Sequence, residues 1–147
     1  MNPNIKPSEQ VALLAVLNPI SQGADTVETG WVSLVDVDQI LAVLQTGVLG
    51  GSATIDAKLE QAKDADGTDA KDITGKAVTQ LVKASNDNDQ VMINCRSDEL
   101  DVNNSFTHVR LSVTVGTAAS LIAAAVYGFY GRYQPVDHLA SVVEVVD

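Results

Sequence analysis

The sequence predicts an all-β protein, an antiparallel β-sandwich of the jelly-roll or immunoglobulin-like kind with extended N- and C-terminal arms. Several segments alternate apolar and polar side chains with period two, and clusters of Gly, Asn and Asp separate them. No segment between them has the 3.6-residue period of an amphipathic helix. We therefore expect six or seven strands, with an N-terminal arm over residues 1–26, a sandwich domain over 27–134 and a C-terminal tail over 135–147.

The clearest strand is HVRLSVTV, residues 108–115, in which every second residue is Val or Leu. Residues 91–100, VMINCRSDEL, alternate in the same way and place Cys95 on the inward side with Val91 and Ile93. Residues 120–133, SLIAAAVYGFYGRY, form a further extended stretch. We expect a strand in each of these three segments.

Earlier in the chain, residues 27–35 and 40–50 predict two strands, followed by a turn at Gly50-Gly51. The near-continuous apolar run in 40–50 is typical of a strand that is covered on both faces. Residues 53–64 contain good helix formers but alternate with period two, and the alternation favours a strand. Residues 64–72 and 85–90 are turn clusters, and 72–82 predict an irregular stretch or a short helix.

The N-terminal apolar run Val11–Leu17 allows two interpretations. Pro7 and Pro19 flank the run and argue against one continuous helix. The run is either an extended arm that packs on a neighbouring molecule, or the first strand of the core. Both interpretations stay open at the level of the sequence.

Composition limits the classes of partner. The chain has 147 residues, 19 Asp and Glu against 9 Lys and Arg, and a net charge of -10. Nucleic acid and anionic membrane surfaces attract clustered basic residues, so we expect neither as a partner. The N-terminus lacks the basic-then-apolar order of a secretion signal, and the single cysteine offers no internal disulfide. These features predict synthesis and folding in a cytoplasm.

No motif predicts catalysis or a metal site. The acidic segment from Asp64 to Asp72 superficially resembles a calcium loop, but Asp69 and Gly75 stand where an EF-hand needs Gly and Glu. His108 and His138 belong to no metal-ligand spacing, and Cys95 is interpreted as a small core residue.

Other catalytic arrangements are equally weak. Asp98, Glu99 and Asp101 could converge with another carboxylate for glycoside chemistry, but they stand in a turn before the strand at 108. The glycine pair at 50–51 is not followed by the lysine and helix of a phosphate-binding loop. We therefore expect no enzyme activity, no cofactor and no metal.

Two segments are candidates for contact with a partner. The C-terminal strand ends in YGFYGRY, whose two glycines favour an edge or an interface over a core strand. The other candidate is the N-terminal apolar run. The predicted contact residues are Val11, Leu13, Leu14, Val16, Tyr127, Phe129, Tyr130 and Tyr133.

Residues 27–136 resemble small virion structural proteins of tailed bacteriophages, which are encoded among the capsid and head genes. The resemblance rests on Gly30-Trp31, on ATIDAKLEQA with its acidic loop, on DITGK at 72–76, and on ELDVN at 99–103 leading into THVR at 107–110. These are strands and turns without a catalytic motif. The resemblance therefore implies a structural role in the particle and carries over no active-site residue.

Within that role, we expect a capsid decoration or cement protein. It would bind the outer surface of the major capsid protein lattice, as a homotrimer, and stabilise the head. Its acidic character suits a surface that faces solvent better than one that faces packaged DNA. The alternatives are a head-completion, neck or tail component that bridges capsid and tail, and a carbohydrate-binding or hydrolytic module on the particle surface.

Overall fold

The computed structural model describes residues 3–146. Among these residues, strands account for most of the regular structure, and the helices are single turns. The elements in chain order are α1 Pro7–Gln10, β1 Val11–Gln22, β2 Thr26–Glu28, β3 Val32–Ser33, β4 Val37–Thr46, β5 Thr54–Ala62, β6 Lys71–Ala77, β7 Leu81–Val82, β8 Gln90–Arg96, the 3-10 turns η1 Ser97–Glu99 and η2 Val102–Asn104, β9 His108–Gly116 and β10 Ser120–Gly131.

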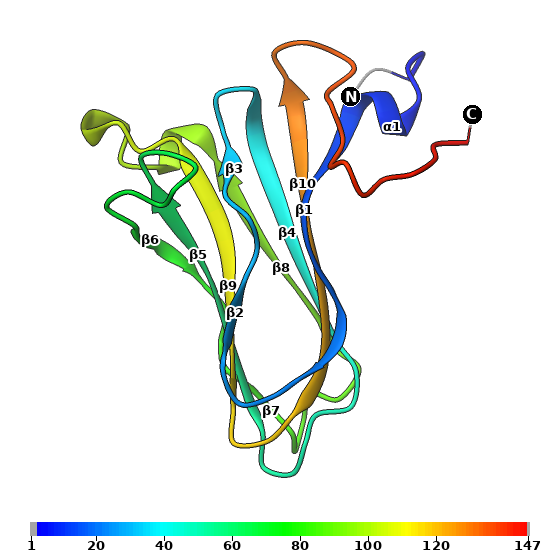
Figure 1. Cartoon of the computed structure of the whole chain (residues 1–147), viewed down its shortest axis with the longest axis vertical. Coiled ribbons are helices and arrows are strands. Elements are labelled where there is room, and N and C mark those ends of the chain that lie inside the picture. The colour runs from blue at the N-terminus through cyan, green and yellow to red at the C-terminus, as the bar shows by residue number, and fades with distance from the viewer. Residues whose placement is uncertain (1–2, 147) are drawn as a thin grey trace.

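The strands form two antiparallel sheets that lie face to face (Figure 1). One sheet has the order β1-β10-β4-β8, and the other has the order β2-β9-β5-β6, with the short strands β3 and β7 paired to β9 and β5. The pairs are nested along the chain, because β1 pairs with β10, β2 with β9, β4 with β8 and β5 with β6. This order is the jelly roll, so the predicted antiparallel sandwich is confirmed and its topology is resolved.

The core lies between the two sheets and is built from the inward phase of each strand. In β9, Val109, Leu111, Val113 and Val115 are at most 2% exposed, as their alternation predicts. In β5, residues 55, 57 and 59 are also at most 2% exposed. The alternation with period two, and not the helix propensity of the residues, therefore predicts the structure of this segment correctly. The strands predicted in 91–100, 108–115 and 120–133 are confirmed as β8, β9 and β10.

The predicted N-terminal arm is wrong over residues 11–22. These residues form β1, which pairs with β10 from Val11↔Phe129 to Gln22↔Ser120. Ala12, Ala15 and Leu17 of β1 are at most 8% exposed. The sandwich therefore starts at Val11 and not at residue 27, because pairing with β10 satisfies the backbone and buries the alternate side chains.

Two smaller differences concern strand continuity. The strand predicted over 27–35 is divided into β2 and β3. Between them, the N–H of Leu111 donates to Thr29 Oγ1 at 3.0 Å, so a side chain replaces a backbone acceptor at this point. The segment predicted to be irregular at 72–82 contains β6 and β7, which sequence reasoning missed because Ile73 and Leu81 alone among their residues are buried.

Both terminal segments lie at the same end of the sandwich (Figure 1). In α1, Pro7 is the first residue of the helix, where its missing N–H leaves no donor without a partner. The Glu9 carboxylate accepts the N–H of Lys6, the N-cap residue, at 2.9 Å. After β10 ends at Gly131, residues 132–146 contain no strand. Residues 1, 2 and 147, which belong to the predicted arm and tail, lie outside the described residues.

Candidate interaction surface

The outward face of the β1-β10-β4-β8 sheet carries apolar side chains where the outward face of a sandwich usually carries polar ones. We call it the apolar face. It consists of Val11, Leu13, Val16 and Ser21 on β1, Leu121, Ala123, Ala125, Tyr127 and Phe129 on β10, Gln39, Leu41, Val43 and Gln45 on β4, and Gln90, Met92, Asn94 and Arg96 on β8.

The register aligns these residues in rows across the four strands. One central row joins Leu13, Tyr127, Leu41 and Asn94. The neighbouring row, one pleat further along, joins residues 16, 125, 43 and 92, all of them apolar. Each of these residues alternates along its strand with residues of the core, so they point away from it.

Several side chains on this face are open to solvent in the single chain. Met92 is 64% exposed and Leu121 is 47% exposed. Exposed apolar surface that is continuous across neighbouring strands is a sign of an interaction site.

The apolar face is hollowed between its large side chains. Ala123 and Ala125 line a depression of about 200 Å³ together with Val16, Val43 and Tyr127. A second depression of about 500 Å³ adjoins it at Ala123 and Gln45 and reaches the 19–21 segment of β1. Small residues at the centre and long ones around them give this face relief.

Charge is confined to one corner of the apolar face. Arg96, at the end of β8, is the charged residue within the rows, and its Nε lies 3.0 Å from Asp98 Oδ1. The remaining polar residues are the amides Gln39, Gln45, Gln90 and Asn94 and the hydroxyl of Ser21.

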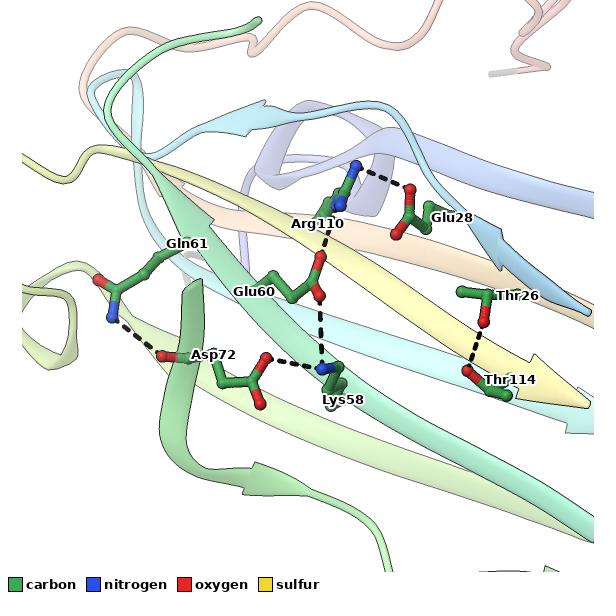
Figure 2. A network of polar contacts seen from close by, with 8 residues as sticks. All are labelled: Thr26, Glu28, Lys58, Glu60, Gln61, Asp72, Arg110 and Thr114. Carbon is green, nitrogen blue, oxygen red and sulfur yellow. Dashed lines mark hydrogen bonds and ion pairs between the residues drawn. The ribbon is translucent and has the colours of Figure 1, made fainter. Parts of the chain in front are cut away.

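The outward face of the other sheet has the opposite character (Figure 2). Arg110 on β9 lies between Glu28 of β2, at 2.8 Å, and Glu60 of β5, at 2.7 Å. Glu60 also faces Lys58 at 3.5 Å, and Lys58 reaches Asp72 of β6 at 2.7 Å. The chain of ion pairs therefore crosses the sheet from β2 to β6 and gives this face its polar surface.

The electrostatic partners shift several pKa values on this side of the molecule. The hydrogen bond with Asp72 raises the pKa of Lys58 above its usual value. At the end of the same sheet, Lys71 and then Asn104 lower the pKa of Asp101. These shifts stabilise the charged forms, as expected for groups that are paired in the folded protein.

The structure divides the eight predicted contact residues between different surroundings. Val11, Leu13, Val16, Tyr127 and Phe129 lie on the apolar face. Sequence reasoning found them on two separate segments, and the pairing of β1 with β10 brings them together. Sequence reasoning did not include residues of β4 and β8 among the contact residues. For β4, the apolar residues on both sides of the strand in 40–50 could have indicated an outward contact.

The other three predicted residues lie elsewhere. Leu14 lies at a β-bulge between Leu13 and Ala15 and points to the inner side of the sheet, where it packs against Gly128. Tyr130 is 55% exposed at a left-handed backbone position, and Tyr133 is 83% exposed. Tyr133 lines a cleft of about 420 Å³ with Leu14 and residues 31–33, 36, 37 and 135–137.

His138 attaches the C-terminal segment to the edge of β1. Its Nδ1 accepts the N–H of Leu13 at 3.1 Å, and the N–H on its Nε2 donates to the carbonyl of Ser8 at 3.0 Å. Leu139 N–H in turn donates to the Leu13 carbonyl at 2.7 Å. The imidazole thus has a structural role that the sequence did not reveal.

Beyond this segment, the tail carries exposed valines. Val143 is 95% exposed and Val146 is 84% exposed. The predicted C-terminal tail is therefore attached to the sandwich through residues 136–139, and its last described residues, 143–146, are exposed.

The acidic and nucleophilic candidates are used in local structure. Asp64 Oδ1 accepts the N–H groups of Asp66 and Thr68, and hydrogen bonds from Thr68 lower the pKa of Asp64. Cys95 is 1% exposed, and burial raises the pKa of its thiol to about 11, which confirms the core interpretation.

The remaining candidates give the same result. Glu99 pairs with Lys76 at 2.9 Å, and Asp101 pairs with Lys71 at 2.5 Å. Within residues 3–146, no group of three or more His, Cys, Asp and Glu side chains is placed to hold a metal ion. In the same residues, no helix is long and apolar enough to cross a membrane.

Comparisons with known proteins give structural neighbours at low identity. No protein-family model matches the sequence, and no curated protein is significantly similar to it. A chain in the structure of broad bean stain virus is 9% identical, with a TM-score of 0.48 over 93% of this chain and 94% of that one. A chain in the structure of Triatoma virus is 8% identical, with a TM-score of 0.46 over 88% and 68% of the two chains. The CBM22-1 xylan-binding domain of Paenibacillus barcinonensis is 13% identical, with a TM-score of 0.41 over 84% and 83%.

Proposed function

We propose that this chain is a structural protein of a virion and acts as a decoration protein on the outer surface of a tailed-bacteriophage head. Its partner would be the major capsid protein, and it would be made in the cytoplasm of the bacterial host. The sequence resemblance over residues 27–136 supports the class of protein. The observation that carries the proposal is a jelly roll that leaves apolar side chains exposed on one sheet face, at Met92 and Leu121, and at the end of the C-terminal tail.

In this proposal the C-terminal tail is the capsid-binding arm, a role that was one of two interpretations of the N-terminal run. Residues 11–22 are committed to β1, whereas Val143 and Val146 extend from the fold with their side chains exposed. An extended segment can add to the edge of a neighbouring sheet through main-chain hydrogen bonds, while its side chains supply specificity. Many copies that each bind modestly through such a segment would stabilise a lattice by avidity.

The charge of the molecule supports an outer rather than an inner position. A net charge of -10 would be repelled by packaged DNA and is compatible with a surface that faces solvent. The proposal includes no catalytic activity and no bound cofactor.

The test replaces two tail valines and measures occupancy on purified capsids. The variant is Val143→Ser/Val146→Ser, and the control is Val35→Ser/Val102→Ser, which changes exposed valines outside the tail. We expect the tail variant to keep the wild-type melting temperature and to lose at least tenfold in capsid affinity, with the control unchanged. Undiminished binding of the tail variant would contradict the arm.

Copy number per particle tests the alternatives. A decoration protein is expected in a copy number proportional to the number of capsid subunits, and cryo-electron microscopy should place it on the outer shell. A number that corresponds to a single ring would favour the head-completion, neck or tail assignment. Retention on polysaccharide without binding to capsids would favour the carbohydrate-binding module.

A further inference from the structure

We propose that the apolar face is a self-association surface, on which two copies of this chain pack sheet against sheet. The inference concerns the free protein in solution and does not depend on the proposed role in a virion. Four observations carry it: the residue pattern of the central strands, the distribution of charge, the size of the face and its relief.

The central strands have the composition of strands that are covered on both sides. β4 is apolar on its inward phase through Ile40 and Leu44 and on its outward phase through Leu41 and Val43. In β10, residues 121–129 are apolar on both phases as well. Strands that face water on one side normally alternate apolar and polar residues, so the outward phase of β4 and β10 indicates a covering layer that a single chain lacks.

The distribution of charge favours a second copy as that layer. Each copy carries a net charge of -10, and two such molecules repel each other at most of their surfaces. The rows of the apolar face contain no Asp or Glu, and Arg96 lies at their corner. Contact through this face keeps the acidic groups of both copies at a distance and leaves the ion pairs around Arg110 in solvent.

The face is large enough for a stable pair. Four strands spaced by about 4.8 Å give a width of about 19 Å, and nine residues of β10 at about 3.3 Å per step give a length of about 26 Å. Two copies would therefore cover about 1,000 Å² of flat area, before the relief of the side chains is counted, which is roughly the lower bound for a specific interface. Sheets pack in this way about 10 Å apart inside β-sandwiches.

The face also has the relief that self-complementary packing needs. Met92 and Leu121 project into solvent, and the hollow over Ala123 and Ala125 lies on the same surface. A twofold axis through the face brings the projecting side chains of each copy over the other copy's surface. Such a contact is isologous and closes at two copies, so we expect a dimer rather than the trimer predicted from the sequence.

The experiment measures the mass of the full chain in solution with two charge-matched variants. Met92→Glu/Leu121→Glu places charges on the apolar face, and Val35→Glu/Val102→Glu adds the same charge at other exposed apolar positions. All four wild-type residues are between 47% and 64% exposed, so the folded chain accommodates either pair. Mass comes from sedimentation equilibrium over a range of concentrations, and circular dichroism and thermal melting report the fold.

We expect the wild type and the control to form a dimer of about 31 kDa, twice the 15.5 kDa of the chain. The face variant should be monomeric, or have a dimer dissociation constant raised at least a hundredfold, with an unchanged dichroism spectrum. A monomeric wild type would overturn the proposal, as would a dimer that persists in the face variant or a trimer. If the wild type is monomeric and the face variant loses capsid binding, the face contacts the capsid protein instead. Loss of dimerisation with retained capsid binding supports the proposal and leaves the proposed function standing, so the two can fail separately.

Discussion

Trp31 occupies a position where two parts of the fold meet. The Arg110 guanidinium lies over the indole, 4.5 Å from the ring centroid, and the same arginine anchors the ion pairs of Figure 2. The indole also lies close to Gly67 of the acidic loop. A Cβ added at Gly67 would come within 2.8 Å of Trp31 Nε1. The loop between β5 and β6 thus packs against the indole, and the absence of a Cβ at Gly67 allows this close approach.

Gly67→Ala should therefore destabilise the protein. Gly67 has a φ of +81°, at which a Cβ costs about 1–2 kcal/mol, and the contact with the indole adds to this cost. We expect a fall in melting temperature of roughly 2–8 °C for a chain of this size. Denaturation followed by the fluorescence of the single tryptophan measures it. Gly51→Ala is the control, because no atom lies within 4 Å of its added Cβ, and an equal loss there would contradict the argument.

Asp101 gives a prediction about pH. Its carboxylate accepts hydrogen bonds from Lys71 and, at 2.9 Å to each oxygen, from Asn104, and its pKa is lowered by both. A folded pKa below the unfolded value means that the stabilisation is complete above the unfolded pKa and is lost as the pH falls through the folded pKa. Asp101→Asn should therefore lower the melting temperature at pH 7, and this difference should shrink between about pH 5 and about pH 2. Asp66→Asn, on an exposed loop residue, should change little, and a difference for Asp101→Asn that is independent of pH would contradict the assignment.

At the scale of elements, the long alternating strands were predictable and the pairing at the sheet edge was not. β5 and β9 were found because one face of each is buried and the other is polar, which leaves a period-two pattern in the sequence. β8 was found because Ile93 and Cys95 alternate with polar residues at 94 and 96. β6 shows no such pattern, since it is a peripheral strand that buries Ile73 alone. β1 was ambiguous because its partner β10 lies at the far end of the chain, and no local signal reports a pairing of that separation.

The candidate surface was predictable only in part for the same reason. Apolar residues at 11–16 and 127–129 were identified separately, and their alignment became visible with the register of β1 and β10. Leu14 was assigned to the surface because it belongs to the apolar run Val11–Leu17, but in β1 it lies on the face opposite to Leu13, beside the bulge.

The pairing of β1 predicts the outcome of an N-terminal deletion. Removing residues 1–20 would delete most of β1 and expose the edge of the apolar strand β10. It would also remove the buried side chains of Ala15 and Leu17 and expose the core residues that they cover. We expect the shortened protein to unfold or aggregate, as measured by solubility and circular dichroism. A soluble protein with a wild-type melting temperature would show that β1 is dispensable. Val143→Ser/Val146→Ser serves as the comparison at the other terminus, where no loss of stability is expected.

The whole molecule is asymmetric, with an ion-paired face on one sheet and an apolar face on the other. Charged side chains lie on the outward face around Arg110, whereas Arg96 is the charged residue within the rows of the apolar face. The apolar face is therefore the one proposed for contact between copies.

The asymmetry predicts how salt affects self-association. Two copies with a net charge of -10 each repel at long range, and the contact through the apolar face gains from burial of apolar surface, which salt does not screen. Raising the ionic strength from about 0.05 M to about 0.5 M shortens the Debye length from roughly 14 Å to roughly 4 Å, so the repulsion should weaken and the dimer should tighten. Sedimentation equilibrium at the two salt concentrations measures the change, and the Met92→Glu/Leu121→Glu variant should stay monomeric in both. Association that weakens with salt would instead indicate contact through ion pairs, and the face around Arg110 and Glu60 would then be the surface to examine.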